Sequence, residues 1–151
     1  MSNHTYSSMF YHIIWSTKNR KPYIKCEFKS KLYDFIGKII VTKEWIPLAI
    51  NGTSDHIHVL FQLFPNYKVS DVVCCIKANS SRFMRDNFIS EFLWQGGYSV
   101  FTVDKKLLPK IKNYIAKQEQ HHAVLTFEDE LMLLLKRNRI SYGDYFKRKL
   151  L

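Results

Sequence analysis

Cysteine is scarce in this sequence, which excludes the protein classes that depend on it. The 151 residues include three cysteines, Cys26, Cys74 and Cys75. An odd number argues against a disulfide framework, and the adjacent pair lacks the Cys-x-x-Cys spacing of zinc and redox sites. We expect all three to be reduced, buried thiols.

Long apolar runs are also missing. The longest, "LMLLL" at residues 131–135, is far shorter than the roughly 20 residues that a helix needs to cross a bilayer. The first residues, "MSNHTYSSMF", lack the charged region and apolar stretch of a secretory signal. We therefore expect a cytoplasmic, soluble protein without a membrane partner.

Acidic residues are outnumbered by basic ones, 13 against 23, so the formal net charge is +10. Such an excess attracts polyanions, and nucleic acid is the obvious candidate partner. What the chain has in quantity is hydrophobic residues, 46% of the total, enough to bury a sizeable core. We expect one domain over residues 1–151, in which about 123–151 form an extension to which the sequence assigns no role.

Residue periodicity predicts alternating strands and helices, with Pro47 marking an edge strand or a bulge and Ser70 capping a helix. The predicted strands are 9–16, 45–50, 56–63 and the end of "WQGGYSVFTV", and the predicted helices are 27–40, 70–86, 105–122 with its regular part from near Pro109, and a short one within 127–151. This order is that of an α+β, ferredoxin-like split β-α-β fold. We expect an antiparallel sheet with helices on one face and the other face open.

The third predicted strand, "HIHVLFQL", carries two histidines one residue apart. Because side chains alternate along a strand, Ile57, Val59 and Phe61 face the core, whereas His56 and His58 share the other face. Their Cα atoms would lie roughly 6–7 Å apart, close enough for both imidazoles to bind one ion. A chance pair on a half-exposed strand gives the same pattern, so a second element has to decide.

Tyr114 and Gln118 provide that second element. They are four residues apart in the last long predicted helix, and therefore lie on one helix face, one turn apart. This spacing lets both side chains reach the same small site. Taken alone, Tyr-x-x-x-Gln carries little information, because a helix tyrosine is usually a packing residue.

Five segments together resemble the HUH class of nucleases, specifically the single-tyrosine transposases of the 200/605 insertion-sequence family and their repeat-associated relatives. The resemblance extends to about residue 122, although Asp104 stands where the family often has a serine. The five segments are "YHIIWSTKNRKPYI", "DHIHVL", "KANSSRFMRD", "WQGGYSVFTV" and "NYIAKQEQHH".

The resemblance implies that Tyr114 is the catalytic residue and that His56, His58 and Gln118 surround a divalent metal, magnesium or manganese. It implies an enzyme of DNA transposition that cleaves and rejoins single-stranded, hairpin-containing DNA through a 5′-phosphotyrosine. A homodimer is also implied. We expect composite active sites, with the histidines from one subunit and Tyr114 from the other.

Several alternatives stay open. Two imidazoles and an amide also suit zinc on ligand preference alone. Asp55 either orients His56 as an outer hydrogen-bond partner of the metal site or simply begins the strand. The competing metal ligands are His12, His121 and His122.

Basic residues supply the candidate DNA surface, because basic grooves hold the backbone of single strands. The rival functions are a domesticated relative that acts on palindromic repeats and a non-catalytic ferredoxin-like nucleic-acid binder, which needs neither Tyr114 nor a metal. The candidate DNA-binding residues are Lys18, Arg20 and Lys21 in the first loop, Lys77, Arg82 and Arg85 on the second helix, and the six basic residues of "KRNRISYGDYFKRK".

Overall fold

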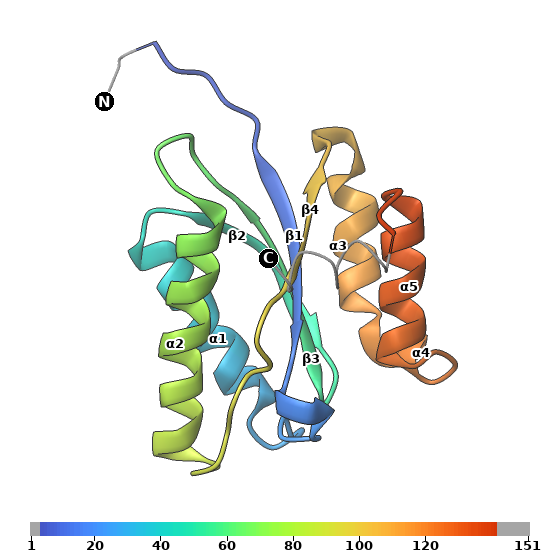
Figure 1. Ribbon diagram of the computed structural model, residues 1–151. Helices are drawn as coiled ribbons and strands as arrows, with labels where there is room; N and C mark the ends of the chain where they lie inside the picture. The colour runs from blue at the N-terminus through green and yellow to red at the C-terminus, as the bar shows by residue number, and fades with distance from the viewer. Residues whose placement is uncertain (1–3, 142–151) are drawn as a thin grey trace. The chain divides into compact units, whose positions relative to one another are not determined.

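The computed structural model of the protein describes residues 4–141, and the chain divides into two compact units, Met1–Gln118 and Glu119–Leu151. A four-stranded antiparallel sheet forms the centre of the first unit, with strand order β2-β3-β1-β4 (Figure 1). Its elements are β1 (Phe10–Ser16), η1 (Lys18–Arg20), α1 (Lys29–Thr42), β2 (Ile46–Gly52), β3 (His56–Gln62), α2 (Val69–Asn87), β4 (Ser99–Val103), η2 (Lys105–Leu107) and α3 (Leu108–Ala116). The predicted order of strands and helices is confirmed.

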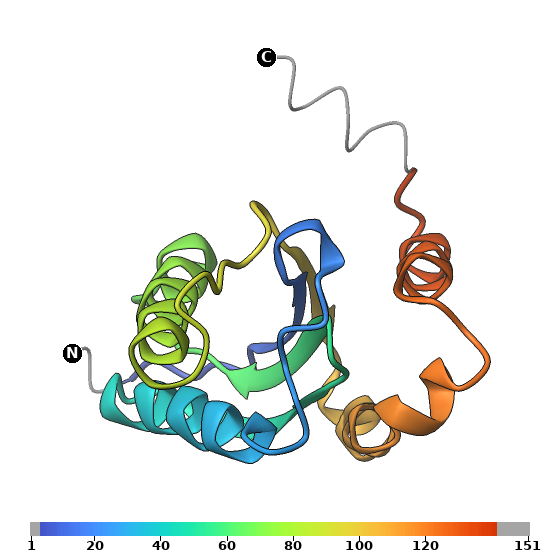
Figure 2. The same ribbon diagram turned by 90° about the horizontal axis from the view of Figure 1, so that it is seen from below.

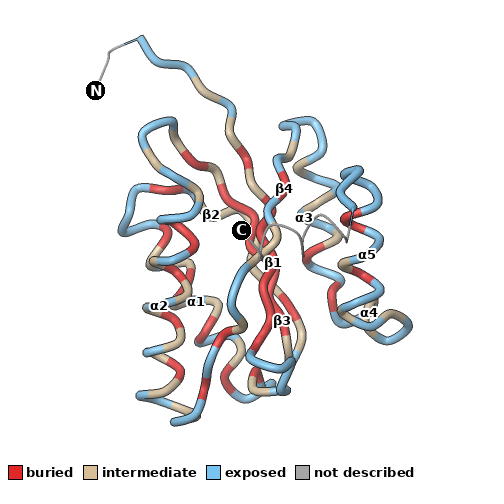
Figure 3. The backbone as a smooth tube through the Cα atoms, viewed as in Figure 1, coloured by how far each residue is buried: buried red, intermediate tan, exposed pale blue. Residues whose placement is uncertain are grey.

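The hydrophobic core lies between one face of the sheet and the helices α1 and α2, as Figure 2 shows from below. The alternation predicted for β3 is confirmed, because Ile57, Val59, Phe61 and Leu63 all belong to this core. The buried stretches of α1 and α2 in Figure 3 face the sheet, at the helical spacing of Leu32, Ile36 and Ile40 or of Val72, Ile76 and Met84. Because these helices pack against the core side of β3, His56 and His58 lie on its other side.

The β2–β3 hairpin sets the position of His56. β2 is an edge strand whose register shifts between Pro47 and Ala49, as the proline predicted. At the turn, a Cβ atom on Gly52 would lie 2.1 Å from the carbonyl oxygen of His56. Glycine is therefore required at this position for the two strands to approach so closely.

The predicted helix over 105–122 is interrupted, which corrects the sequence-based interpretation. Pro109 lies in the first turn of α3, as expected, but α3 ends at Ala116 and a second helix, α4 (Gln118–His122), follows Lys117. The Asn51 side chain donates to the carbonyl oxygens of Ile115 (2.9 Å) and Ala116 (3.3 Å). The last carbonyls of α3 are thus satisfied from the sheet rather than by a further helical turn.

The second face of the sheet was expected to be open, but a helix covers it. α3 lies on this face, opposite α1 and α2, and contacts β2 (Figures 1 and 2). Asp104, the residue that departs from the family pattern, accepts a hydrogen bond from the Lys106 N–H at 2.8 Å and begins η2. Aspartate and serine both cap helices in this way, so the departure preserves the local structure.

Two smaller expectations are wrong. Cys26 and Cys74 are exposed free thiols and Cys75 is half-buried, because the inward positions of α2 are taken by Val72, Val73 and Ile76. α2 begins at Val69 after Lys68, so Ser70 lies inside the helix instead of capping it.

The second unit contains the helix α5 (Phe127–Arg137), which confirms the short helix expected after residue 127. Thr126 and Asp129 form a reciprocal capping box at its start. Three acidic residues in the first turn and two basic residues in the last complement the helix dipole. Among residues 4–141, no helix is both long and apolar enough to span a membrane.

Candidate metal and nucleophile site

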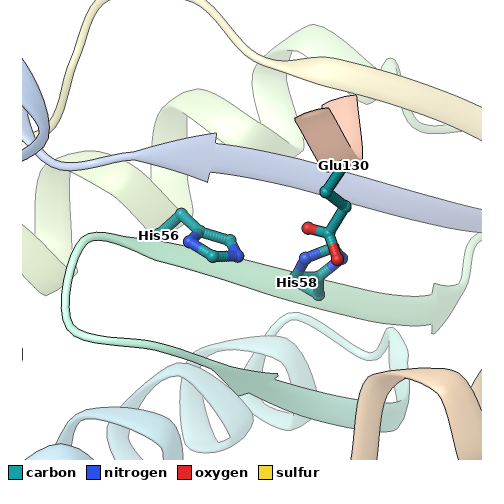
Figure 4. Close-up of side chains that lie close together, drawn as sticks. All are labelled: His56, His58 and Glu130. Carbon is teal, nitrogen blue, oxygen red and sulfur yellow. The ribbon is translucent and has the colours of Figure 1, made fainter. Parts of the chain in front are cut away.

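His56 and His58 project from the same face of β3, as predicted (Figure 4). Strand pairing places Ser16 opposite His56 and Ile14 opposite His58 on the neighbouring strand β1. Both histidines are fully buried, unlike the half-exposed pair that chance alternation would give. Their potential ligand nitrogens lie within 4.8 Å of each other, so both can reach one metal ion.

The imidazole of His56 is held by Asp55 and Thr53. The Thr53 hydroxyl donates to Asp55 Oδ1 at 3.0 Å, and His56 Nδ1 lies 2.8 Å from the same oxygen and 2.9 Å from Thr53 Oγ1. Because the hydroxyl proton is directed to Asp55, Nδ1–H of His56 is the donor to the carboxylate. The Nε2 atom of His56 is then the nitrogen that a metal would use.

Gln118 completes this corner of the site, although it does not share a continuous helix with Tyr114. Its Oε1 atom lies 3.2 Å from Nε2 of His56. With Nδ1 protonated, neutral His56 presents a lone pair at Nε2. A ring nitrogen and an amide oxygen are both suitable metal ligands, so this pair fits a single cation.

Tyr114 lies beside the histidines. Its ring centroid is 5.9 Å from that of His58 and 6.4 Å from that of His12, in both cases edge-on. The Asn51 hydrogen bonds to Ile115 and Ala116 fix the adjoining backbone of α3. The nucleophile candidate and the metal-ligand candidates are therefore brought together within one chain.

His12 enters the site from β1. It is 2% exposed, and its Nε2 atom lies 2.8 Å from Nδ1 of His58. His121 and His122 belong to α4 in the second unit, where His122 Nε2 is 3.2 Å from Glu130 Oε1 of α5. His12 is thus bonded to one of the predicted ligands within the first unit.

Comparison with known proteins identifies the family of this site. The family described as "Transposase IS200 like" matches residues 5–118. The chain belongs to the IS200-like transposases. The matched stretch ends at Gln118, the last residue of the first unit.

Two curated transposases are similar to this chain over most of its length. The ISDra2 transposase TnpA of Deinococcus radiodurans is 26% identical over 115 residues, which cover 72% of this chain and 82% of that protein. The transposase for insertion sequence element IS200 of Salmonella typhimurium is 29% identical over 122 residues, covering 76% and 80%.

Two solved structures share the fold. A transposase from Deinococcus radiodurans R1 has a TM-score of 0.63 and 27% identity, and the match covers 78% of this chain and 97% of that one. A REP-associated tyrosine transposase bound to a REP hairpin has a TM-score of 0.60 over 83% of this chain and 76% of that one. With 15% identity, the second likeness is one of fold alone.

The basic residues predicted on α2 lie away from the histidines of this IS200-like transposase, because α2 covers the opposite face of the sheet. Lys77 Nζ donates to the carbonyl oxygens of Gln95 (2.6 Å) and Gly97 (2.8 Å). Burial lowers the pKa of Lys77, while the neighbouring Cys74 acts in the opposite direction. Arg85 donates to Phe92 O at 3.3 Å, whereas Arg82 is exposed. Two of these three predicted DNA contacts thus hold the loop before β4.

The basic residues of η1 and its end, Lys18, Arg20 and Lys21, are exposed beside the site. The Thr17 N–H donates to Asp55 O at 2.8 Å, which joins this loop to the residue that orients His56. Asn19 and Arg20 have φ values of 54° and 51°, a left-handed conformation that asparagine tolerates but that is costly for arginine. Of the predicted C-terminal basic residues, Lys136, Arg137 and Arg139 lie in the second unit, and positions 147–149 lie outside the described residues.

Sequence reasoning missed two residues of the site. Asn51 and Thr53 lie between the predicted strands 45–50 and 56–63 and were given no role, yet Asn51 fixes the end of α3 and Thr53 bonds both Asp55 and His56. The available signal was the phase of β2, because Asn51 pairs with His58 and so shares its face.

Proposed function

We propose that this IS200-like transposase cleaves and rejoins single-stranded DNA through a 5′-phosphotyrosine formed by Tyr114. The observation that carries the proposal is the position of Tyr114, whose ring lies 5.9 Å from that of His58. His56, His58 and Gln118 line the same small volume. A nucleophile beside a set of metal ligands is the arrangement that phosphoryl transfer requires.

The reaction conserves the energy of the phosphodiester bond. The phenolic oxygen of Tyr114 attacks the scissile phosphorus, a new P–O bond forms to the tyrosine, and the bond to the 3′ oxygen breaks. That oxygen leaves as a 3′-hydroxyl after taking a proton. One phosphodiester has replaced another, so attack by a 3′-hydroxyl on the phosphotyrosine rejoins the strand without an external energy source.

The residues present fit a divalent cation, for which we propose magnesium or manganese. A phenol ordinarily has a pKa of about 10, so the attacking oxygen needs positive charge nearby at neutral pH. His56 Nε2, His58 and Gln118 Oε1 would hold the cation. When bound, it supplies Lewis-acid stabilisation and orients phosphate oxygens. Asp55 keeps the proton of His56 on Nδ1.

The proposed substrate is a hairpin-containing single strand, handled by a homodimer with a ferredoxin-like fold in each subunit. Exposed Lys18, Arg20 and Lys21 lie at the His56 end of the sheet, where they would contact DNA phosphates. A REP hairpin is bound to the tyrosine transposase that shares this fold. A domesticated relative acting on palindromic repeats would use the same chemistry, whereas a non-catalytic binder would not need Tyr114.

The test replaces the Tyr114 hydroxyl. Tyr114→Phe should abolish cleavage and covalent attachment, because the nucleophile is lost, but retain strand binding. The matched control is Tyr11→Phe, since Tyr11 packs against the core on the other face of β1. A hairpin-containing strand labelled at its 3′ end is incubated with magnesium or manganese and run on a denaturing gel. The label must be at the 3′ end, because tyrosine keeps the downstream fragment through its 5′ phosphate. A covalent adduct with Tyr114→Phe would disprove the assignment.

A further inference from the structure

His12 is a buried histidine that the proposed chemistry does not use. It lies on β1 opposite Leu60 of β3 and Phe101 of β4, two pairs along the strands from the pair formed by Ile14 and His58. This diagonal relation brings side chains on one sheet face within reach. The result is the 2.8 Å contact between Nε2 of His12 and Nδ1 of His58.

The hydrogen bond between the two imidazoles contains one proton, and its position decides which nitrogen of His58 can bind a metal. A ligating nitrogen must present a lone pair. If neutral His58 ligates through Nε2, its proton is on Nδ1, and Nδ1–H donates to Nε2 of His12. His12 then carries its own proton on Nδ1.

We propose that His12 is a positioning residue that holds His58 as the Nδ1–H tautomer, with Nε2 directed to the metal. This inference rests on the proposed metal-dependent function. His12 does for His58 what Asp55 does for His56, whose Nδ1 is 2.8 Å from Asp55 Oδ1. Each proposed ligand histidine is thus oriented through its Nδ1 atom. For His56 the partner is the carboxylate of the residue before β3, and for His58 it is an imidazole on β1.

The rival role for His12 is that of a third histidine ligand. Its Nε2 atom is already engaged by His58, and the ring is enclosed by Phe101 and Tyr114, at centroid distances of 6.3 Å and 6.4 Å. An outer hydrogen-bond partner changes metal affinity without adding to the number of coordinated nitrogens. The two roles therefore give different results when coordinated histidines are counted.

The experiment measures manganese affinity of the full chain by calorimetry for two variants. His12→Phe keeps a ring of similar size but removes the acceptor, and should weaken manganese binding about 10–100-fold. His12→Gln places an amide oxygen near the position of Nε2 and should recover most of that affinity. Equal affinity in wild type and His12→Phe would overturn the proposal, as would an equal loss in both variants.

A second measurement does not depend on the variants folding. Nitrogen-15 NMR of histidine-labelled, metal-free wild type should show His58 protonated at Nδ1, and pulsed EPR of the manganese form should detect two coordinated imidazoles. A His58 protonated at Nε2, or a third coordinated imidazole, would overturn the proposal. Tyr114→Phe should leave both signatures unchanged. The cleavage assay can therefore contradict the proposed function while the NMR and EPR results support the role of His12. Equally, the NMR and EPR results can contradict that role while cleavage depends on Tyr114.

Discussion

His56 and His58 are identical side chains two positions apart, yet each is fixed by a different group. Asp55 and Thr53 bind the Nδ1 atom of His56, and His12 binds that of His58. A metal site gains affinity when its ligands are already oriented, because less ordering remains to be done on binding. We therefore expect the residues that orient His56 and His58 to affect metal affinity nearly as much as these proposed ligands themselves.

Asp55 provides a residue-scale prediction. Asp55→Leu removes the carboxylate that holds Nδ1 of His56, so manganese affinity should fall about 10–100-fold. Because the Asp55 side chain is 28% exposed, the melting temperature should change little. Asp34→Leu is the matched control, on an exposed position of α1. Unchanged manganese affinity in Asp55→Leu would show that the strand, rather than the carboxylate, orients His56.

The histidine pair could be predicted from the sequence, but its partners could not. Alternation along "HIHVLFQL" assigns faces because one set of residues is apolar. Both faces of β1 are covered, and every residue of the strand except Tyr11 is buried. Apolar residues therefore do not alternate with polar ones along β1, and the sequence does not tell which face His12 occupies. Which residues lie across from each other depends on register, and register is set by the turn and the whole sheet.

Among the elements, the existence and order of strands and helices followed from periodicity, whereas one boundary did not. Residues 105–122 read as a continuous helix, but α3 stops at Ala116. The hydrogen bonds that stop it come from Asn51, which is 64 and 65 residues away in sequence from the two acceptors. Residue periodicity within a helix carries no information about a hydrogen bond from a distant strand that ends the helix.

The β2–β3 turn gives the element-scale prediction. Gly52→Ala places a Cβ atom 2.1 Å from the His56 carbonyl oxygen, so the hairpin must open, and the free energy of unfolding should fall by about 1–3 kcal/mol. Manganese affinity should fall as well, because His56 moves. The control is Gly37→Ala in α1, where the nearest atom is 3.8 Å away and alanine should stabilise the helix by about 0.5–1 kcal/mol. Denaturant unfolding measures both, and equal stability of the two variants would contradict the steric argument.

For the molecule as a whole, the two faces of the sheet have different contents: one carries the apolar core and the other carries the histidines of the candidate site. One face binds α1 and α2 through the apolar residues of β3, and the other presents His12, His56 and His58 to α3. Composition predicted a sizeable core, which the structure confirms, because the content of apolar residues does not depend on their order. The attraction to polyanions stays a prediction. Composition could not predict that α3 would return to the histidine face, because that placement depends on side chains such as Asn51.

The placement of α3 bears on whether each site uses residues of one chain or two. The sequence resemblance led us to expect exchange of Tyr114 between subunits, but α3 is bound to β2 of its own chain through Asn51, and Tyr114 lies 5.9 Å from His58 of the same chain. We still predict exchange, because the same contact of α3 with β2 can form between two subunits that swap α3. Two mixed dimers, purified by different tags on their subunits, separate the possibilities.

The first mixed dimer pairs a His56→Ala chain with a Tyr114→Phe chain, and the second pairs a wild-type chain with one carrying both changes. If each chain completes its own site, the first dimer has no intact site and the second has one, so only the second should cleave, at about half the wild-type rate. Exchange of Tyr114 reverses this result, because His56 and Tyr114 then meet intact only in the first dimer. Both dimers contain the same substitutions in the same numbers, so a difference in folding or strand binding cannot produce the contrast. Cleavage by the first dimer alone would show that Tyr114 works with the histidines of the partner subunit, whereas cleavage by the second dimer alone would contradict exchange.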